Sequence, residues 1–543
     1  MLEVSGIRLP VTALDGSDQR ELAACRKAAS RMLHVGEAKI EGLELRRRSI
    51  DARRRDRIQL TFTVRLSLRG DEREVARRNA KCCRQVDLQD GYRLPTMEEG
   101  LFGERPIVVG AGCAGLFCAL ALASAGAKPW LIERGDDADT RTRRVEAFDA
   151  GGELDPESNI QFGLGGAGTF SDGKLQTGTK SPAHRLILET LADAGASGRI
   201  LYDAKPHVGS DVLPGVVSTI AGRIEELGGT VSFRHRMCGL EVADGRVRAI
   251  TVAHDGREER VRTEHVVLAC GHSARDVFEL LRNTGVTLER KTFAMGVRIE
   301  HLQADIDRAL YGRMAGHPAL GAAPYKLATH LEGGRSAFSF CMCPGGTVVC
   351  AASEPVGVVT NGQSLSARDG INANAGLLAN VFPDDLPGDD ALAGIELQRA
   401  CERAAFVAGG GQFRAPAQLV GDFLAHVPSK TAGSVRPTYA RGVAWGEIDG
   451  CLPDYIVRTL REALPRMERS IRRFSAPDAV LTGVETRSSS PVRVTRDEEG
   501  QSTSTRGLWP CGEGAGYAGG IMSAATDGLR CAEALVAHQR KRA

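Results

Sequence analysis

The feature that most constrains this chain is a glycine-rich turn between two short apolar segments, in PIVVGAGCAGLFCALALASAGAKPWLIER (residues 106–134). Ile107-Val108-Val109 is suited to a strand that is buried on both faces, as in a parallel sheet. Residues 116–125 have the composition of a helix, which Gly126 can end, and residues 129–132 can form the next strand. This order predicts a β-α-β unit, the repeating element of α/β folds.

Gly110, Gly112 and Gly115 stand at the end of the first strand with the spacing G-x-G-x-x-G. In such a turn the first glycine permits the sharp bend, the second lets a diphosphate approach the backbone, and the third lets helix and strand pack closely. The free N–H groups at the start of the helix then face the diphosphate. Glu133 closes the second strand, where a carboxylate can accept hydrogen bonds from ribose hydroxyls. A turn that served packing alone would not require Glu133, so we expect a dinucleotide to bind here.

Three later segments favour FAD over NAD as that dinucleotide. Residues 161–174 (QFGLGGAGTFSDGK) form a second glycine-rich loop, too irregular for a helix, that can bring backbone close to a long ligand. Residues 265–271 (HVVLACG) indicate a strand that ends in glycine, and residues 507–530 contain a strand, a glycine-rich turn and a helix from near Gly520. The start of that helix can face a flavin carbonyl, and Glu513 in the turn can hold a ribityl hydroxyl.

On these residues the chain resembles a family of uncharacterised bacterial FAD-dependent dehydrogenases, within the glutathione-reductase class of flavoproteins. The segments that carry the resemblance are NIQFGLGGAGTFSDGKLQT (159–177), FSFCMCPGG (338–346), ETRSSSPVRV (485–494), GLWPCGEGAGYAGGIMSAATDG (507–528) and SIDARRRDRIQLTFTV (49–64). The resemblance implies an α/β fold with a Rossmann-like FAD-binding domain, an interleaved α+β substrate domain and a small N-terminal α+β domain. It implies no particular substrate. Broader flavoproteins carry Asp where this chain has Glu513, whose longer side chain shifts the ribityl contact without removing it.

The chain has 543 residues, more than one hydrophobic core normally holds, so several domains are expected. We predict an N-terminal domain at 1–98, the first part of the FAD-binding domain at 99–280, a substrate domain at 281–485 and the C-terminal part of the FAD-binding domain at 486–543. Within the N-terminal domain, residues 18–33 open with a helix cap followed by helix formers, and residues 58–64 alternate as a half-buried strand does.

The expected cofactor site draws on the glycine-rich segments and on the strand ends beside them. A flavin supplies the hydride and electron chemistry itself, so the protein's part is to position and tune it. The residues that we predict to bind FAD are Gly110, Ala111, Gly112, Cys113, Ala114, Gly115, Glu133, Arg134, Gly165, Gly166, Gly168, Thr169, Lys174, Cys238, Ala269, Cys270, Gly271, Gly512, Glu513, Gly514, Gly519, Gly520 and Ile521.

Four residues are candidates for catalytic roles: Lys174, Cys341, Cys343 and Arg487. Lys174 follows the second glycine loop, where its charge could stabilise negative charge on a reduced flavin ring. The alternative is a surface lysine at the end of a loop. Arg487, in the hydroxyl-rich sequence ETRSSSP, could orient an anionic substrate through two hydrogen bonds, or form an ion pair with Glu485 or another acid.

Cys341 and Cys343 alternate in FSFCMCPGG, and side chains two residues apart on a strand face the same side. Both could face the flavin as redox-active or catalytic thiols, or both could be packed in a core, as free cysteines commonly are. Two cysteines without a nearby histidine are too few for zinc, so we predict no metal site. Three isolated histidines are candidate general acids or bases, or else ordinary polar residues: His272, His301 and His330.

These features predict a FAD-dependent oxidoreductase that transfers a hydride between a small organic substrate and the flavin. No second G-x-G-x-x-G follows a buried strand, so NAD(P)H or another electron donor or acceptor would dock transiently. Two other functions stay open: RNA modification, with the basic run at 46–57 holding nucleic acid, and a non-enzymatic flavin redox sensor. The basic run lacks aromatic residues for base stacking and includes its own Asp partners, which favours a solvated strand–turn–strand.

Composition excludes several other classes of protein. The formal net charge of +2 provides no strong field toward nucleic acid or an anionic membrane. No stretch approaches about 18 uncharged apolar residues, and the N-terminal residues lack the basic-then-apolar pattern of a secretion signal. The 14 cysteines are scattered and include no C-x-x-C, which is typical of reduced thiols in a large core. We therefore expect a cytoplasmic protein with a small-molecule substrate and without a membrane or nucleic-acid partner.

Overall fold

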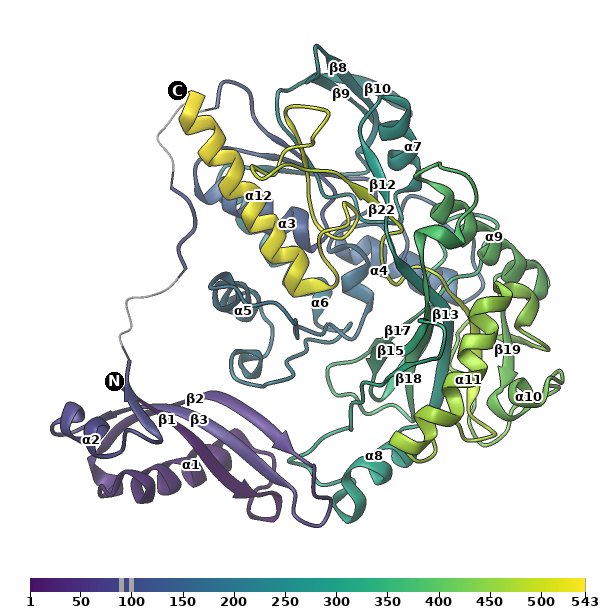
Figure 1. Ribbon diagram of the computed structural model, residues 1–543. Helices are drawn as coiled ribbons and strands as arrows, with labels where there is room; N and C mark the ends of the chain where they lie inside the picture. Colours follow the sequence, from purple (N-terminus) through teal and green to yellow (C-terminus); the bar gives the residue numbers. More distant parts are fainter. Residues whose placement is uncertain (87–91, 97–101, 543) are drawn as a thin grey trace.

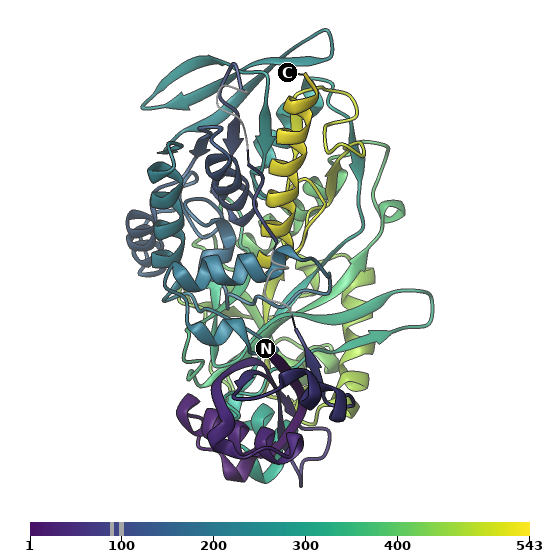
Figure 2. The same ribbon diagram turned by 90° about the vertical axis from the view of Figure 1, so that its left-hand side faces the viewer.

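The computed structural model describes residues 1–86, 92–96 and 102–542. Figure 1 shows an N-terminal sheet at one end of the molecule, away from the other layers. In both Figure 1 and Figure 2, α12 (Ile521–Arg542) runs from the middle of the molecule outward to the C terminus. The predicted boundary between residues 98 and 99 lies outside the described residues, and the other domain boundaries stay predictions.

The N-terminal sheet has four antiparallel strands in the order β2-β3-β1-β4. Its elements are β1 (Leu2–Pro10), α1 (Asp18–Leu33), β2 (Ile40–Asp51), β3 (Gln59–Leu68), α2 (Glu72–Arg78) and β4 (Cys83–Gln85). This chain order and strand order are those of the split β-α-β, or ferredoxin-like, arrangement. The predicted helix at 18–33 is confirmed. The predicted strand at 58–64 overlaps β3, in which buried Phe62 and Val64 alternate with half-buried residues.

A parallel sheet of five strands contains the glycine-rich turn. In spatial order its strands are β23 (Leu508–Pro510), β11 (Val266–Leu268), β5 (Ile107–Val109), β6 (Trp130–Glu133) and β7 (Thr230–Phe233), each parallel to its neighbour. The predicted β-α-β unit is confirmed, because α3 (Cys113–Ser124) connects β5 to β6. The helix begins at Cys113 rather than at residue 116 and therefore includes Gly115 in its first turn.

The last part of the chain completes this parallel fold. β23 pairs with β11, and α12 packs along α3 (Figure 1). α3 also contacts α6 (Leu213–Glu226), so the residues from Ala114 to Ala123 are all buried. This enclosure explains why α3 is apolar all round rather than amphipathic. The fold is therefore α/β, as predicted, and its sheet joins segments that are about 400 residues apart in the sequence.

A seven-stranded mixed sheet is inserted between β11 and β23. In spatial order its strands are β14 (Ala328–His330), β15 (Ser336–Cys343), β18 (Asn372–Val381), β13 (Phe293–Leu302), β21 (Val480–Glu485), β19 (Ala415–Leu419) and β20 (Val443–Trp445). Just before and after this sheet, β12 (Leu288–Arg290) and β22 (Val492–Val494) pair antiparallel. The chain therefore leaves the parallel fold and returns to it at neighbouring points.

The remaining elements cover these sheets or join them. The helices are α4 (Ala138–Asp149), α5 (Ala183–Asp193), α7 (Arg275–Asn283), α8 (Gln303–Tyr311), α9 (Ala393–Ala408), α10 (Val420–Ala425) and α11 (Asp454–Ser470). The strands are β8 (Arg236–Ala243), β9 (Arg246–His254) and β10 (Arg257–Arg262) in one sheet, and β16 (Gly346–Cys350) with β17 (Thr360–Ser364). Short 3-10 helices span Val11–Ala13, Glu37–Lys39, Gly166–Phe170, Gly198–Leu201, Gly312–Met314, Pro383–Asp385 and Asp449–Cys451. No described helix has the length and apolar character needed to cross a membrane.

The predicted loop at 161–174 differs in one respect, because the 3-10 helix Gly166–Phe170 lies within it. The basic run at 46–57 also differs from a continuous basic surface. Arg48 is buried, pairs with Glu21 at 2.9 Å and donates to the Ala319 carbonyl at 2.7 Å. It therefore attaches the N-terminal sheet to the rest of the molecule.

We expect Gly528→Ala to destabilise the protein, although alanine normally stabilises a helix. A β-carbon at Gly528 in α12 would collide with the Ala114 carbonyl oxygen of α3, and such overpacking costs about 1–3 kcal/mol. Gly222 in α6 is the matched control, because a β-carbon there meets nothing within 4 Å. Gly222→Ala should raise the free energy of unfolding by up to about 1 kcal/mol. Thermal or urea unfolding of both variants checks this, and equal effects would contradict the close helix contact.

Candidate functional site

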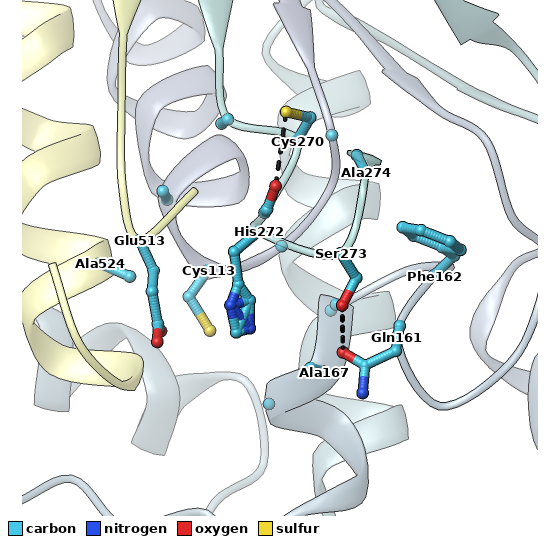
Figure 3. Close-up of a pocket in the computed structure, with 18 of the residues that line it drawn as sticks. Cys113, Gln161, Phe162, Ala167, Cys270, His272, Ser273, Ala274, Glu513 and Ala524 are labelled. Atoms are coloured by element: carbon cyan, nitrogen blue, oxygen red, sulfur yellow. Dashed lines mark hydrogen bonds between the residues drawn. The ribbon is translucent and has the colours of Figure 1, made fainter. Parts of the chain in front are cut away.

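One cavity of about 370 Å³ is lined both by the carboxyl ends of β5, β6 and β11 and by residues of the inserted segment. This volume lies within the usual range of ligand pockets, about 300–1,000 Å³. In open α/β sheets, ligands bind at this edge of the strands. Figure 3 shows Cys113, His272 and Glu513 pointing into the cavity from three different segments.

The glycine turn forms one wall of the cavity, with four lining residues: Gly110, Gly112, Cys113 and Ala114. Within the described chain no side chain caps the start of α3, so its first N–H groups can serve an anion. A β-carbon at Gly115 would collide with the Gly110 carbonyl oxygen, so this glycine serves packing. A β-carbon at Gly112 would meet only the Gly166 Cα, at 3.9 Å, so this glycine leaves open space.

The Glu133 carboxylate holds the first glycine turn against the second glycine loop. One oxygen accepts from the Ala111 N–H at 2.8 Å, and the other accepts from the N–H groups of Gly135 and Gly163, both at 2.9 Å. Glu133 lines the cavity and is buried. The binding of ribose by Glu133 stays a prediction. In the structure this carboxylate also aligns three backbone segments through its hydrogen bonds.

The second glycine loop crosses over the first, since the Gly165 N–H donates to the Ala111 carbonyl at 2.8 Å. Its lining residues include Gly165, Gly166 and Gly168, whereas Thr169 is turned away and donates to the Leu164 carbonyl. Arg141 of α4, fully buried, holds this loop by donating to five carbonyl groups, those of Asn159, Ile160, Gly163, Leu164 and Gly166. Nothing in the sequence near Arg141 indicated this role.

The third wall comes from the segments after β11 and β23. Ala269, Cys270, Gly271, Glu513, Gly519, Gly520 and Ile521 line the cavity, whereas Gly512 and Gly514 are not among its lining residues. The Gly520 N–H donates to Glu513 at 3.1 Å, at the start of α12. Burial raises the pKa of Glu513 to about 7, although this hydrogen bond and Lys291 oppose the rise. The carboxyl group can therefore gain or lose a proton near neutral pH.

Two predicted cofactor residues occupy other roles in the structure. Arg134 lines the cavity but pairs with Glu157 at 2.8 Å and Asp276 at 2.9 Å, and its guanidinium lies over the Phe162 ring. Cys238 does not line the cavity, and its thiol donates to the Thr251 carbonyl across the β8–β9 pair. Met237 lines the cavity instead. The register of β8 against β9 shifts between Met237 and Gly239, so Cys238 lies at an irregularity of the strand.

The inserted segment and the end of the second glycine loop bring polar and charged side chains to the same cavity. Lys174, Cys341, Asn361 and Glu485 all line it, and Lys174 pairs with Asp172 at 3.2 Å. Beneath them, fully buried Arg298 pairs with Glu485 at 2.5 Å and donates to the Asn361 side-chain oxygen. Burial raises the pKa of Glu485, against the effect of Arg298. Glu485 and Asn361 were not predicted, because nothing local in the sequence links them to this cavity.

The predicted alternation of Cys341 and Cys343 is wrong, because β15 contains a bulge between Phe340 and Cys343. Cys341 has φ = 40°, in the left-handed region that non-glycine residues rarely adopt. Cys341 lines the cavity, whereas Cys343 is completely buried and outside the lining set. Only one of the two thiols therefore faces the ligand space directly.

Arg487 lines the cavity but is held by a buried carboxylate. It donates to Glu402 at 2.8 and 3.0 Å and to the Ser353 hydroxyl at 2.5 Å. Arg275 bonds the same carboxylate at 2.7 and 2.9 Å. Burial acts to raise the pKa of Glu402, but the two guanidinium groups hold it well below its usual range. Of the two alternatives for Arg487, the structure contains the ion pair, and its acid is Glu402 rather than Glu485.

The three candidate histidines occupy different surroundings. His272 lines the cavity, and burial lowers its pKa to about 3, so its ring is neutral. His301 is buried against the Phe474 carbonyl, and His330 is exposed and bonded to Ser336. Among the described residues one group of three potential metal ligands lies together, Cys511, Asp527 and Cys531. The Asp527 carboxylate there is already bonded to Arg496 and to the Gly512 N–H.

Over 519 residues the chain is 43% identical to an uncharacterised protein of Clostridium beijerinckii, with 95% of this chain and 96% of that protein covered. The chain belongs to the same family as that protein. Residues 292–488 of this chain match the domain described as FAD-dependent protein, C-terminal domain-like. Residues 1–67 match a domain of unknown function, DUF8436. The predicted kinship with uncharacterised FAD-dependent proteins is confirmed to that extent.

Among solved structures, this family member is similar to the flavin-dependent brominase Bmp2, at 12% identity and a TM-score of 0.37 over 80% of this chain and 79% of the other. It is also similar to a geranylgeranyl bacteriochlorophyll reductase-like protein of Thermoplasma acidophilum, at 13% identity and a TM-score of 0.35 over 81% and 79%. Identities and scores of this size say nothing about function.

Glu402→Gln should lower the free energy of unfolding by about 3 kcal/mol, because it leaves Arg275 and Arg487 buried without their shared charge. The folded pKa of Glu402 lies below the unfolded value, so its contribution is present above about pH 4.3 and is lost as the pH falls further. The difference between wild type and variant should therefore shrink in acid. Denaturant unfolding at several pH values measures it. Asp390→Asn, which breaks the exposed pair with Arg282, is the control and should cost at most about 1 kcal/mol.

Iodoacetamide should alkylate Cys341 at pH 7 at least about tenfold faster than Cys113, another thiol that lines the cavity. The Cys343 hydrogen bond, Lys174 and Arg298 lower the pKa of Cys341 against the effect of burial, whereas burial raises that of Cys113 to about 12. Peptide mass spectrometry after timed labelling measures both rates. Lys174→Met should slow the reaction of Cys341, while Lys326→Met, at an exposed site, should not. Equal labelling of the two thiols would contradict the assigned charge state.

Proposed function

We propose that this protein binds FAD in the cavity and is an oxidoreductase that transfers a hydride between a small organic substrate and the flavin. The observation that carries the proposal is the single cavity that joins the uncapped start of α3, the end of β6 and the start of α12. Each end of an extended dinucleotide would lie beside the N-terminus of a helix, α3 at one end and α12 at the other. The match of residues 292–488 to a domain of FAD-dependent proteins supports the same conclusion.

The residues present fit the cofactor on three points. The space beside Gly112, where a β-carbon would meet only the Gly166 Cα, suits a diphosphate approaching the backbone. Glu133 lines the cavity at the end of β6, where a ribose would lie. Glu513 lines it at the start of α12 and suits a ribityl hydroxyl. When bound, FAD would supply two-electron redox chemistry.

Two side chains that line the cavity would tune and protonate the reacting groups. Lys174 keeps a positive charge. Burial lowers its pKa, but Cys343 and Asp172 raise it by more, so the pKa is raised overall. That charge can stabilise negative charge that develops beside it. Glu485, with a pKa raised by burial, can hold a proton and release it to a ligand in the cavity. We propose Lys174 as the electrostatic group and Glu485 as the acid–base group.

An RNA-modifying function has less support, because part of the basic run is paired with acids of the protein itself. Arg48 is buried with Glu21, and Arg53 pairs with Asp51. A redox sensor without turnover would share the cofactor site and differ only in having no small substrate. Anaerobic mixing with NADH, NADPH and pooled metabolites separates these cases, since bleaching of the flavin band identifies an electron donor. A protein that binds FAD but is bleached by none of them would favour the sensor.

The purified protein should carry FAD, visible as the absorption bands of an oxidised flavin. Gly112→Ala should weaken FAD binding roughly tenfold or more, because the methyl group fills the space for the diphosphate. The same change should leave the melting temperature of the cofactor-free protein nearly unaltered, since no protein atom is displaced. Fluorescence titration with FAD and thermal unfolding measure the two effects, with Gly222→Ala as control. A colourless protein that takes up no FAD would end the proposal, and unchanged binding by Gly112→Ala would move the diphosphate elsewhere.

A further inference from the structure

The bulge at the end of β15 folds the Cys343 thiol back onto the residue two positions before it. In a regular strand, residues two apart are separated by about 6.8 Å, which is the upper limit for a disulfide. At Cys341 the chain turns through the left-handed region instead, with φ = 40°. The Cys343 thiol then donates to the Cys341 carbonyl oxygen at 3.2 Å. The backbone distortion thus folds the Cys343 side chain back toward the backbone of Cys341.

The distorted backbone is held in place by two cations. The Cys341 carbonyl accepts from Arg298 at 2.9 Å, and the next carbonyl, that of Met342, accepts from Lys174. A strained conformation of this kind persists only where its surroundings hold it, and such residues concentrate at functional sites. The two cations also favour a thiolate, and the pKa of Cys341 is lowered. Both acids beside them are paired, Glu485 with Arg298 and Asp172 with Lys174 and Arg368, and Asp172 only partly opposes the lowered pKa of Cys341.

The two thiols differ in access and in charge. Cys341 lines the cavity and is the better thiolate, whereas Cys343 is completely buried and its pKa is raised by the hydrogen bond to Cys341 and by burial. This asymmetry suits a dithiol in which one sulfur meets the reaction partner and the other closes the disulfide. Packing alone would require neither the left-handed turn nor the lysine at its carbonyl.

We propose that Cys341 and Cys343 form a redox-active dithiol that exchanges two electrons with the flavin bound in the cavity. This inference rests on the proposed function for its electron partner. The two thiols each give up a proton and together give up two electrons as the S–S bond forms, and the oxidised flavin takes up both electrons and both protons. In the reverse direction the S–S bond is cleaved and both thiols are restored. The protein would thereby hold two redox couples in one site, and its substrates would include thiols and disulfides that exchange with Cys341.

An anaerobic reductive titration of the oxidised holoprotein measures how many electrons the protein takes up for each FAD bound. Wild type should take up about four electrons per FAD, two for the flavin and two for the disulfide. Cys341→Ser and Cys343→Ser should each take up about two electrons for each FAD bound. Cys350→Ala, which removes a neighbouring buried thiol, should still take up about four. Uptake of about two electrons by wild type would overturn the proposal.

A second measurement does not depend on the flavin or on the folding of a variant. The protein is equilibrated in glutathione buffers of graded potential, its free thiols are blocked, and tryptic peptides are analysed by mass spectrometry. Residues 336–368 form one tryptic peptide, which holds Cys341, Cys343 and Cys350. A disulfide between Cys341 and Cys343 should appear in this peptide in oxidising buffers, with only Cys350 blocked.

The two measurements separate failure of this inference from failure of the proposed function. A protein that takes up no FAD but forms the disulfide in glutathione buffers would contradict the proposed function and leave a redox-active dithiol. A protein that binds FAD but keeps both thiols blocked at every potential would contradict the dithiol alone. A disulfide that includes Cys350 would also overturn the assignment of the pair.

Discussion

The carboxylate of Glu133 is the interaction on which the cavity depends. It accepts hydrogen bonds from the backbone of the first glycine turn, the end of β6 and the second glycine loop. A buried charge is tolerated only when it is fully bonded, and bonds to a charged acceptor are stronger than neutral ones. Arg141 secures the second loop from its other side by donating to five carbonyls. Together the two side chains shape loops that contain too few apolar residues to pack by themselves.

The cavity also depends on contacts between distant parts of the chain. β23 pairs with β11 and α12 packs on α3, so the start of α12 is brought to the same space as the start of α3. The inserted sheet contributes the remaining wall, and its charged groups are neutralised in pairs. Arg298 with Glu485 supports the wall beneath Cys341, and Arg275 with Glu402 supports the wall at Arg487. These buried pairs fix the positions of Cys341 and Arg487, which line the cavity.

Much of the fold follows from short stretches of sequence. The β-α-β unit, the helix at 18–33 and the strand near 58–64 were predicted because each depends on local properties: apolar runs, caps and alternation. The α/β class followed from the order of those segments. The site was predicted in part, since the glycine segments, Glu133, Glu513 and Lys174 do line one cavity. The errors at Thr169, Cys238 and Cys343 share one cause, because the face to which a side chain points depends on bulges and turns that local composition does not reveal.

The sequence by itself determined the parallel strands, the glycine turn and the small-residue segments that let backbone approach a ligand, because glycine spacing and apolar runs act over a few residues. Only the tertiary structure decided which charges are partnered. Glu402 rather than Glu485 holds Arg487, Arg298 lies under Cys341, and Arg141 secures the second loop. Each of these contacts joins residues that are far apart in the chain or unmarked by any motif. Their pairing follows from the packing of two sheets, since a buried charge must find its partner among whatever groups the fold brings near.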